Sequence, residues 1–242
     1  MTPLDPRDQI ILDHAPLLAA PRFGTLPALE NGRHRFIMAR YGPYLEVKRP
    51  WLHGLFDLLS GDSGLDMELP YGDIDARFDL SFDWHADVFP LVSTFIEAAA
   101  QVAPQEHAAW LLWNDMERRL EYRELIAISA SGGGISYHYP KLDPHLSLAV
   151  DLHSHGAMSA FFSATDDEDD AGAVKIAGVI GKLGMGGAPE WQFRLCALGL
   201  LRELDLSDVQ RCSACGCTED NPCLNGCWWV RPDLCSACIG PF

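Results

Sequence analysis

Apolar residues recur along the chain at spacings that change from element to element. From Phe89 to residue 103 they follow helical spacing, and the run stops before Pro104, which predicts a helix. Residues 51–59 (WLHGLFDLL) carry a second apolar run, and we expect a helix there too. The segments RFIMAR and YLEVK flank the turn sequence at residues 41–43 (YGP) and predict a hairpin.

Continuous apolar runs in the second half of the chain predict strands. The clearest is residues 146–152 (LSLAVDL), and the others are 110–113, 125–131, 135–139, 174–181 and 191–199. The glycines at 132–134 and in the 184–187 region indicate turns, because neither group is followed by the Gly-Lys-Ser/Thr of a phosphate loop. Strands interrupted by helices are typical of α/β layers.

We expect the chain to divide into three parts. Residues 1–88, with several Pro and Gly breaks, form a small α/β lobe to which we assign no chemistry. Residues 89–208 contain the predicted strands, and residues 209–242 contain most of the cysteines. At 242 residues with 48% hydrophobic content, the chain can bury one sizeable core beside smaller modules.

The charge balance argues against nucleic acid as a partner. With 34 acidic against 18 basic residues, the formal net charge of -16 repels a phosphate backbone. No apolar run reaches the roughly 18 residues of a membrane span. The N-terminus MTPLDPRDQI lacks a basic region before an apolar segment, so no signal peptide is indicated. We therefore expect a cytoplasmic protein without a membrane partner.

The most informative stretch begins with His153 and His155, which follow the predicted strand 146–152. Residues two apart on a strand point to the same face, so both imidazoles can reach one ion. Seven residues separate His155 from Ser163, and Asp166 comes three positions later. Asp166 would supply a third ligand and leave the fourth tetrahedral position to water, as in catalytic zinc sites. Ser163 and Asp166 also form an S-x2-D capping box, which is compatible with a ligand role because a capped helix start is rigid.

A zinc hydrolase also needs a general base outside its ligand set, usually a carboxylate. Glu106 is the best candidate, because it lies just before the apolar run WLLW and upstream of the histidine pair. Four other acids in this part of the chain are rivals: Glu97, Glu117, Glu121 and Glu124. The pattern therefore predicts an amide hydrolase with Glu106 as its base.

This combination of residues resembles the JAB/MPN (JAMM) metallopeptidases, whose pattern is a Glu, then H-x-H, seven residues, Ser, two residues and Asp. The resemblance covers roughly residues 90–200. The segments 123–140 (RELIAISASGGGISYHYP) and 152–170 (LHSHGAMSAFFSATDDEDD) resemble the PRTRC system protein A branch, found in bacterial cassettes beside ThiF-like and ubiquitin-like proteins. The resemblance implies a cytidine-deaminase-like α/β sandwich. One departure is Gly156, where many members have proline after the second histidine.

The resemblance also implies a role for each site residue. It makes His153, His155 and Asp166 the zinc ligands, Glu106 the general acid/base, and Ser163 a residue that helps to hold the developing oxyanion. The implied function is a zinc peptidase or isopeptidase that hydrolyses an amide bond at the C-terminus of a ubiquitin-like or sulfur-carrier-like protein, with ThiF/E1-like cassette proteins as further partners. The alternative is a non-catalytic metal-binding scaffold in a ubiquitin-like conjugation cassette. A scaffold would show a broken motif, and this motif is intact.

The C-terminal part holds seven of the eight cysteines, within residues 212–238. Its outer pairs have C-x2-C spacing and suit a closed tetrahedral zinc site with the ligands Cys212, Cys215, Cys235 and Cys238. Three cysteines are then left over: Cys217, Cys223 and Cys227. Seven thiolates fit two zinc ions that share one bridging sulfur, or an iron–sulfur cluster with spare cysteines, and the sequence does not choose between them. Disulfides are disfavoured, since Cys196 is the only other cysteine and no secretory signal is expected.

Overall fold

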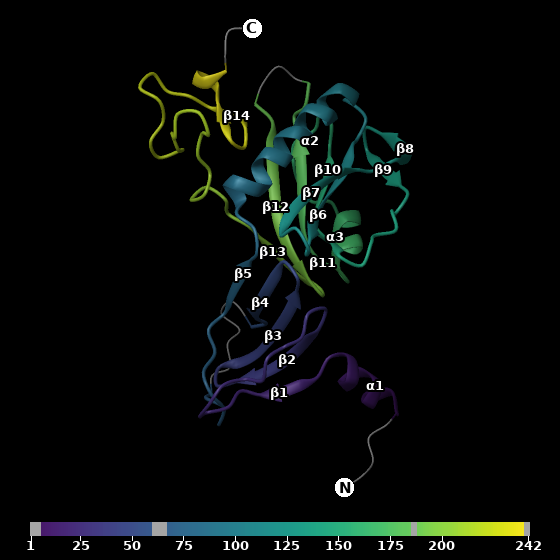
Figure 1. Cartoon of the computed structure of the whole chain (residues 1–242), viewed down its shortest axis with the longest axis vertical. Coiled ribbons are helices and arrows are strands. Elements are labelled where there is room, and N and C mark those ends of the chain that lie inside the picture. Colours follow the sequence, from purple (N-terminus) through teal and green to yellow (C-terminus); the bar gives the residue numbers. More distant parts are fainter. Residues whose placement is uncertain (1–5, 60–66, 185–187, 240–242) are drawn as a thin grey trace. The chain divides into compact units, whose positions relative to one another are not determined.

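A computed structural model describes residues 6–59, 67–184 and 188–239 of the protein (Figure 1). The chain forms two compact units, residues 1–81 and residues 82–242. Each unit has its own main sheet, so the protein is of mixed α/β class. Most of the turn predicted in the 184–187 region lies outside the described residues. Among the helices that the described ranges contain, none is both long and apolar enough to cross a bilayer.

The first unit is built on a five-stranded sheet with the order β1-β2-β3-β4-β5. Its elements are α1 (Pro6–His14), β1 (Leu17–Ala19), β2 (His34–Ala39), β3 (Gly42–Arg49), β4 (Leu52–Asp57) and β5 (Arg77–Leu80). Strands β1 and β2 pair in parallel, and the other neighbours pair antiparallel. The predicted hairpin is confirmed as β2 and β3. Its turn is tighter than expected, because Gly42 already pairs with Ala39.

The helix predicted at residues 51–59 is wrong, because this segment contains strand β4. Residues of β4 pair with β3 on one side and with β5 on the other. Apart from His53, most of the strand is buried on both faces, so apolar residues at adjacent positions imitate helical spacing. Gly54, a poor helix former, lies at its centre, where the Phe56 ring occupies the space that a Cβ would fill.

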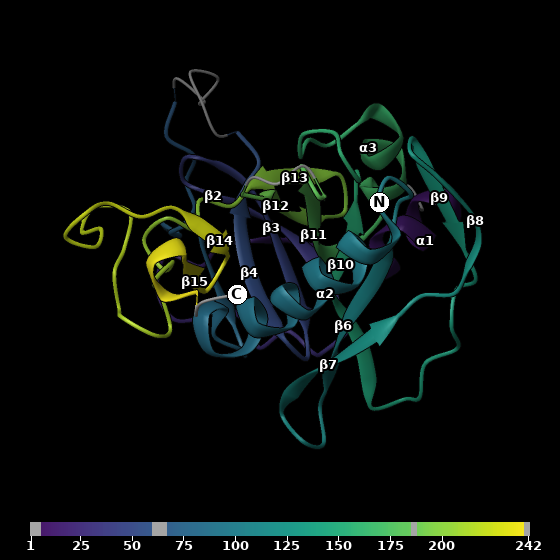
Figure 2. The same ribbon diagram turned by 90° about the horizontal axis from the view of Figure 1, so that it is seen from above.

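The second unit contains a six-stranded sheet with the order β13-β12-β11-β10-β6-β7 (Figure 1). The strands are β6 (Ala108–Asn114), β7 (Arg119–Glu124), β10 (Leu146–Ser154), β11 (Val174–Gly181), β12 (Glu190–Ala197) and β13 (Leu200–Glu203). Strands β10 and β11 pair in parallel, and the other neighbours pair antiparallel. Helix α2 (Phe89–Val102) crosses this sheet (Figure 2). It buries an apolar stripe that includes Phe89, Val92, Phe95, Ile96 and Ala99.

These elements confirm the helix predicted from Phe89 and the six predicted strands of the second half. The strands predicted at 125–131 and 135–139 form β8 (Ala127–Ser131) and β9 (Gly134–Tyr137), a separate hairpin outside the main sheet. The pattern did not predict the edge strands β7 and β13. Strand β7 interleaves charged with apolar residues and β13 has only two adjacent apolar residues, so neither gives a continuous apolar run.

The C-terminal segment belongs to the second unit and packs against α2. It contains β14 (Trp229–Arg231), β15 (Leu234–Cys235) and the short 3-10 helix η2 (Ser236–Cys238), and a π-helical turn η1 (Trp84–Val88) precedes α2. The Ser93 hydroxyl on α2 donates a hydrogen bond of 2.7 Å to an Asp233 carboxylate oxygen. Arg231 also forms an ion pair of 2.6 Å with Glu97 on α2. The tail is therefore anchored to the helix that leads to Glu106.

Candidate metal centre

Strand β10 and helix α3 (Ala164–Asp170) bring together the three predicted ligands. His153 lies near the end of β10, His155 directly follows the strand, and Asp166 lies in the first turn of α3. The two Nε2 atoms are 3.2 Å apart, and His153 Nε2 is 3.4 Å from Asp166 Oδ1. Ligands bound tetrahedrally at the usual zinc distances of about 2.0–2.1 Å are separated by about 3.3 Å. The three side chains therefore fit a zinc ion.

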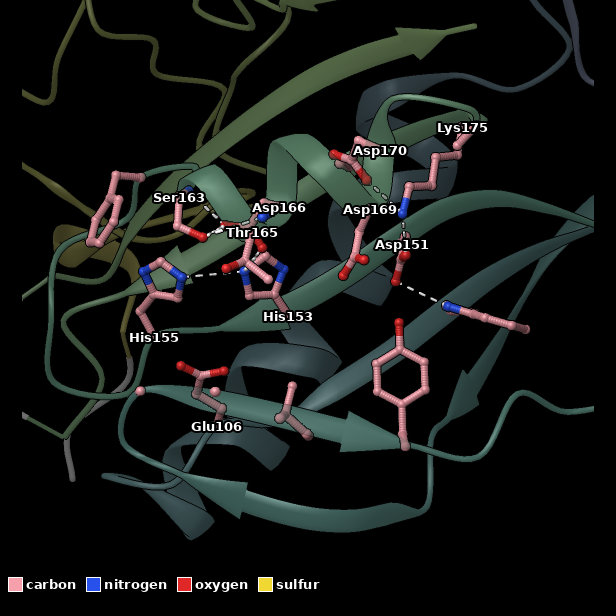
Figure 3. Close-up of a pocket in the computed structure, with 18 of the residues that line it drawn as sticks. Glu106, Asp151, His153, His155, Ser163, Thr165, Asp166, Asp169, Asp170 and Lys175 are labelled. Carbon is pink, nitrogen blue, oxygen red and sulfur yellow. Dashed lines mark hydrogen bonds and ion pairs between the residues drawn. The ribbon is translucent and has the colours of Figure 1, made fainter. Parts of the chain in front are cut away.

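A capping box fixes the orientation of Asp166 (Figure 3). The backbone N–H and the hydroxyl of Ser163 both donate to Asp166 Oδ2 at 2.6 Å, and the backbone N–H of Asp166 donates to Ser163 Oγ at 3.3 Å. Oδ1 is thus left to face His153. The predicted cap is confirmed, and it turns one carboxylate oxygen toward the metal position. Since Ser163 has one hydroxyl hydrogen and gives it to Asp166, oxyanion binding by Ser163 stays a prediction.

The protonation of these groups suits metal binding. Burial lowers the pKa of His153, which favours the neutral ring that a metal requires. His155 Nδ1 lies 3.3 Å from the Ser159 carbonyl oxygen, an acceptor that selects the tautomer with Nδ1–H and turns Nε2 toward the metal position. Burial acts to raise the pKa of Asp166, but the Ser163 hydroxyl bond and the nearby His153 outweigh it, so the net pKa is lowered. Asp166 is therefore held as a carboxylate.

Glu106 lies across the cavity from the two imidazoles, with its carboxyl group turned toward them (Figure 3). It is 6% exposed, and its backbone N–H donates to the carbonyl of Ser131 at 2.8 Å. Burial raises the pKa of Glu106 to about 7, with a smaller contribution from Asp166. A carboxyl group with such a pKa can both accept and return a proton near neutral pH.

The rival acids lie elsewhere. Glu97 pairs with Arg231 and Glu117 with Arg119, while Glu121 accepts from Asn114 and Glu124 lies beside His107. Among the described residues that line the cavity, Glu106 is the only glutamate. The geometry therefore favours Glu106 as the base.

Two hydrogen bonds hold the Glu106 segment against the ligand segment. His107 N–H donates to Ser154 Oγ and Ser154 N–H donates to the His107 carbonyl, both at 2.9 Å. Gly156 has φ +53, and a Cβ there would come within 2.5 Å of the Pro104 carbonyl oxygen. Proline cannot adopt this φ, and a Cβ at this position would clash with the segment before Glu106. Glycine, where many members of the family that the chain resembles have proline, therefore permits the close approach of the two segments.

Three aromatic side chains, Trp110, Tyr137 and Tyr139, line part of the cavity, whose volume is about 410 Å³. Tyr137 and Tyr139 have ring centroids 5.2 Å apart, and Trp110 lies 5.8 Å from Tyr139 and 6.3 Å from Tyr137. The sequence analysis did not assign these residues to the site. Tyr137 lies on β9 and Tyr139 follows two positions later. This i, i+2 spacing was the signal in the sequence, but it does not show which face of the strand borders the cavity.

A buried charge network lies beside the ligands. Lys175 Nζ is 2.6 Å from Asp151 Oδ2 and 2.7 Å from Asp170 Oδ1 (Figure 3). Arg194 also pairs with Asp170, at 2.7 Å. Asp151 Oδ1 accepts from the Trp110 indole N–H at 3.0 Å. Lys175 therefore neutralises two carboxylates that border the cavity. The sequence did not predict this network, because its members lie on different elements and their spacing gives no signal of ion pairs.

We expect Lys175→Met to destabilise the second unit by about 3–5 kcal/mol, because it leaves the largely buried Asp151 carboxylate without its ammonium partner, while Asp170 keeps Arg194. Urea unfolding followed by tryptophan fluorescence measures the change. Lys182→Met is the matched control, since the Lys182–Glu190 pair is exposed and is expected to contribute about 0–1 kcal/mol. Equal losses in the two variants would contradict the structural role of the network.

The cysteines of the tail form two overlapping groups of four thiols. One group is Cys212, Cys215, Cys217 and Cys235, and the other is Cys217, Cys223, Cys227 and Cys235. Four thiol pairs have S···S separations of 3.7–3.9 Å, close to the roughly 3.8 Å expected between thiolates bound tetrahedrally to zinc at about 2.3 Å. The first group differs from the sequence-based set in that Cys217 replaces Cys238. All eight cysteines, each among the described residues, are free thiols.

Comparison with known families gives two matches. Residues 89–196 match the family described as prokaryotic homologs of the JAB domain. Residues 5–81 match a domain of unknown function, DUF2016. No curated protein sequence matches the chain. The first match supports the JAB resemblance found in the sequence, and the PRTRC branch stays a prediction.

Proposed function

We propose that the protein is a JAMM-type zinc peptidase or isopeptidase, because residues 89–196 match the family described as prokaryotic homologs of the JAB domain. The observation that carries the proposal is the convergence of His153, His155 and Asp166 at separations that suit zinc, opposite the buried carboxyl group of Glu106. An interaction scaffold would not need a buried carboxyl group near pKa 7 facing a complete ligand set. The non-catalytic scaffold is therefore the second candidate.

The proposed substrate is the C-terminal tail of a ubiquitin-like or sulfur-carrier-like protein. The resemblance of residues 123–140 and 152–170 to PRTRC system protein A supports this class and suggests ThiF/E1-like proteins as cassette partners. An extended tail suits a cavity of about 410 Å³ that is open at the surface and bounded by aromatic side chains. The core of the proposed domain would adopt the cytidine-deaminase-like sandwich that the resemblance implies.

The roles of the chain's own residues follow from their positions. A zinc ion held by His153, His155 and Asp166 would polarise the scissile carbonyl and lower the pKa of a water molecule. Glu106 takes the proton of the attacking water and delivers it to the leaving nitrogen. Ser163 keeps Asp166 turned toward the ligand position, and it would aid the oxyanion only after its hydroxyl rotates away from Asp166.

The C-terminal thiols form the second proposed metal centre, with one or two structural zinc ions. A segment of about 30 residues has too little core to fold alone, so metal binding would supply much of its stability. An iron–sulfur cluster is the alternative use of the same thiols. With the JAB site included, the purified protein should carry two or three zinc ions per chain. Elemental analysis checks this number, and iron with visible absorbance would favour the cluster.

Incubation of the zinc-loaded full-length protein with a ubiquitin-like fusion, followed by intact mass spectrometry, tests the enzyme proposal. We expect two products whose masses assign the cut to the C-terminal tail of the ubiquitin-like part. Addition of a chelator should stop the reaction, because the three-ligand site loses its ion. Tight binding of the fusion without cleavage would favour the scaffold instead.

A further inference from the structure

The tail thiols form one continuous cluster rather than two separate sites. Cys235 and Cys217 belong to both four-thiol groups. Cys215 Sγ lies 3.8 Å from Cys235 Sγ in the first group, and Cys223 Sγ of the second group lies 3.9 Å from the same atom. Thiols from both ends of the segment therefore converge on Cys235.

The number of thiols constrains how two metals could be bound. Two separate tetrahedral sites need eight sulfur ligands, and the tail has seven cysteines. One shared thiolate supplies the missing position. If two thiolates were shared, six cysteines would suffice and one would be spare. The contacts of Cys238 decide between these arrangements.

Cys238 takes part in the cluster although it lies outside both four-thiol groups. Its side chain packs against the buried cysteines of the cluster, and its C-x2-C spacing pairs it with Cys235, as the same spacing pairs Cys212 with Cys215. Cys238 can thus complete a site with these three, which is the set that the paired C-x2-C spacing indicated. All seven thiols then have a place, and Cys217 is needed only on the other metal.

We propose that the tail binds two metal ions in a single thiolate cluster bridged by Cys235. The terminal ligands of one metal are Cys212, Cys215 and Cys238, and those of the other are Cys217, Cys223 and Cys227. This inference rests on the proposed metal binding by the tail and goes beyond it by making the two sites interdependent. Cys235 is 1% exposed, as suits a bridging sulfur at the centre of a cluster.

Backbone N–H groups and a fixed turn support the cluster. The N–H groups of Cys235 and Cys223 donate to the sulfurs of Cys212 and Cys227, at 3.5 and 3.4 Å, which stabilises thiolates. The Asp233 carbonyl accepts from both the N–H and the hydroxyl of Ser213, at 2.8 and 2.9 Å. The same Asp233 accepts from Ser93 on α2 through its carboxylate. The cluster thus fixes the turn that anchors the tail to the JAB domain.

Zinc stoichiometry by native mass spectrometry tests the bridge, in a His153→Ala background that disables the JAB site. We expect two zinc ions per chain. Cys235→Ser should lower the affinity for both ions by more than about 10-fold, the lower range seen for loss of an outer-shell partner. Cys238→Ser should lower the affinity for one ion only. Cys196→Ser, which removes the one cysteine outside the tail, is the control and should leave the affinity for both ions unchanged.

Each departure from this pattern overturns the proposal. Loss of a single ion in Cys235→Ser would mean separate sites. Loss of both ions in Cys217→Ser, with no ion lost in Cys238→Ser, would mean that Cys217 and Cys235 both bridge the two metals and that Cys238 is not a ligand. If the His153→Ala protein bound no metal, the tail would not be a metal site at all. Cleavage of the ubiquitin-like fusion by the wild type is measured separately, so the peptidase proposal stands or falls independently.

Cobalt substitution gives a second measurement that needs no cysteine variant. Two Co²⁺ ions that share a thiolate are magnetically coupled, so the electron paramagnetic resonance signal per cobalt should fall as the second ion binds. The His153→Ala protein, freed of metal and titrated with Co²⁺, is the sample. A signal that grows in proportion to bound cobalt up to two ions would exclude the bridge.

Discussion

Glu106→Gln should lower the cleavage rate by about 10²- to 10⁴-fold, the usual contribution of general acid/base catalysis. Glutamine keeps the size of the side chain and most of its hydrogen bonding, but it cannot take a proton from water. Glu106 lies outside the ligand set, so the zinc content and the melting temperature should stay unchanged. Measuring the zinc stoichiometry beside the cleavage rate separates this loss from a loss of metal.

Glu117→Gln is the matched control for this variant, because Glu117 is an exposed acid from the same part of the chain and pairs with Arg119. Its cleavage rate should equal that of the wild type. Full turnover by Glu106→Gln would mean that another acid at the cavity takes the proton, and Asp169, which also lines the cavity, would be tested next.

The site motif could be predicted from the sequence because its geometry is local. Residues 153 and 155 share one face of a strand, and Ser163 to Asp166 form one turn of a capped helix, so their spacing determines much of their arrangement. Glu106 is different, since it is 47 positions from His153 in sequence, counted from their residue numbers. It could be selected only by its place before a strand and by the resemblance. Burial then distinguished it from the exposed acids.

What the sequence could not predict depends on pairing across the fold. The segment 51–59 has an apolar pattern that fits a helix, and only its pairing with β3 and β5 makes it a strand. The partners of Lys175 lie 24 and 5 positions away, on β10 and α3, and neither spacing signals an ion pair. The same limit applies to the cysteines, where spacing suggested one complete set but could not identify the shared sulfur.

Asp166→Asn should reduce zinc affinity at the proposed site of His153, His155 and Asp166 much more than Ser163→Ala does. Asparagine keeps the size of the side chain and the capacity to accept from Ser163, but it removes the negative charge that faces the ion. Ser163→Ala leaves the charge in place and removes the hydroxyl bond that orients it. Loss of such an outer partner typically costs about 10- to 100-fold in affinity or activity. Zinc affinity measured by competition with a chelator gives both values.

The capping box adds a second readout that separates the two effects. Ser163→Ala removes the N-cap of α3 and should cost about 0.5–2 kcal/mol of stability, whereas Asp166→Asn retains the Ser163 cap. Glu168→Gln changes an exposed acid on the same helix that does not line the cavity, so it is the control and should alter neither quantity. If Asp166→Asn bound zinc as tightly as the wild type, Asp166 would be only a capping residue. The ion would then need a third ligand from elsewhere in the cavity, where Asp169 and Glu106 are the nearest acids to test.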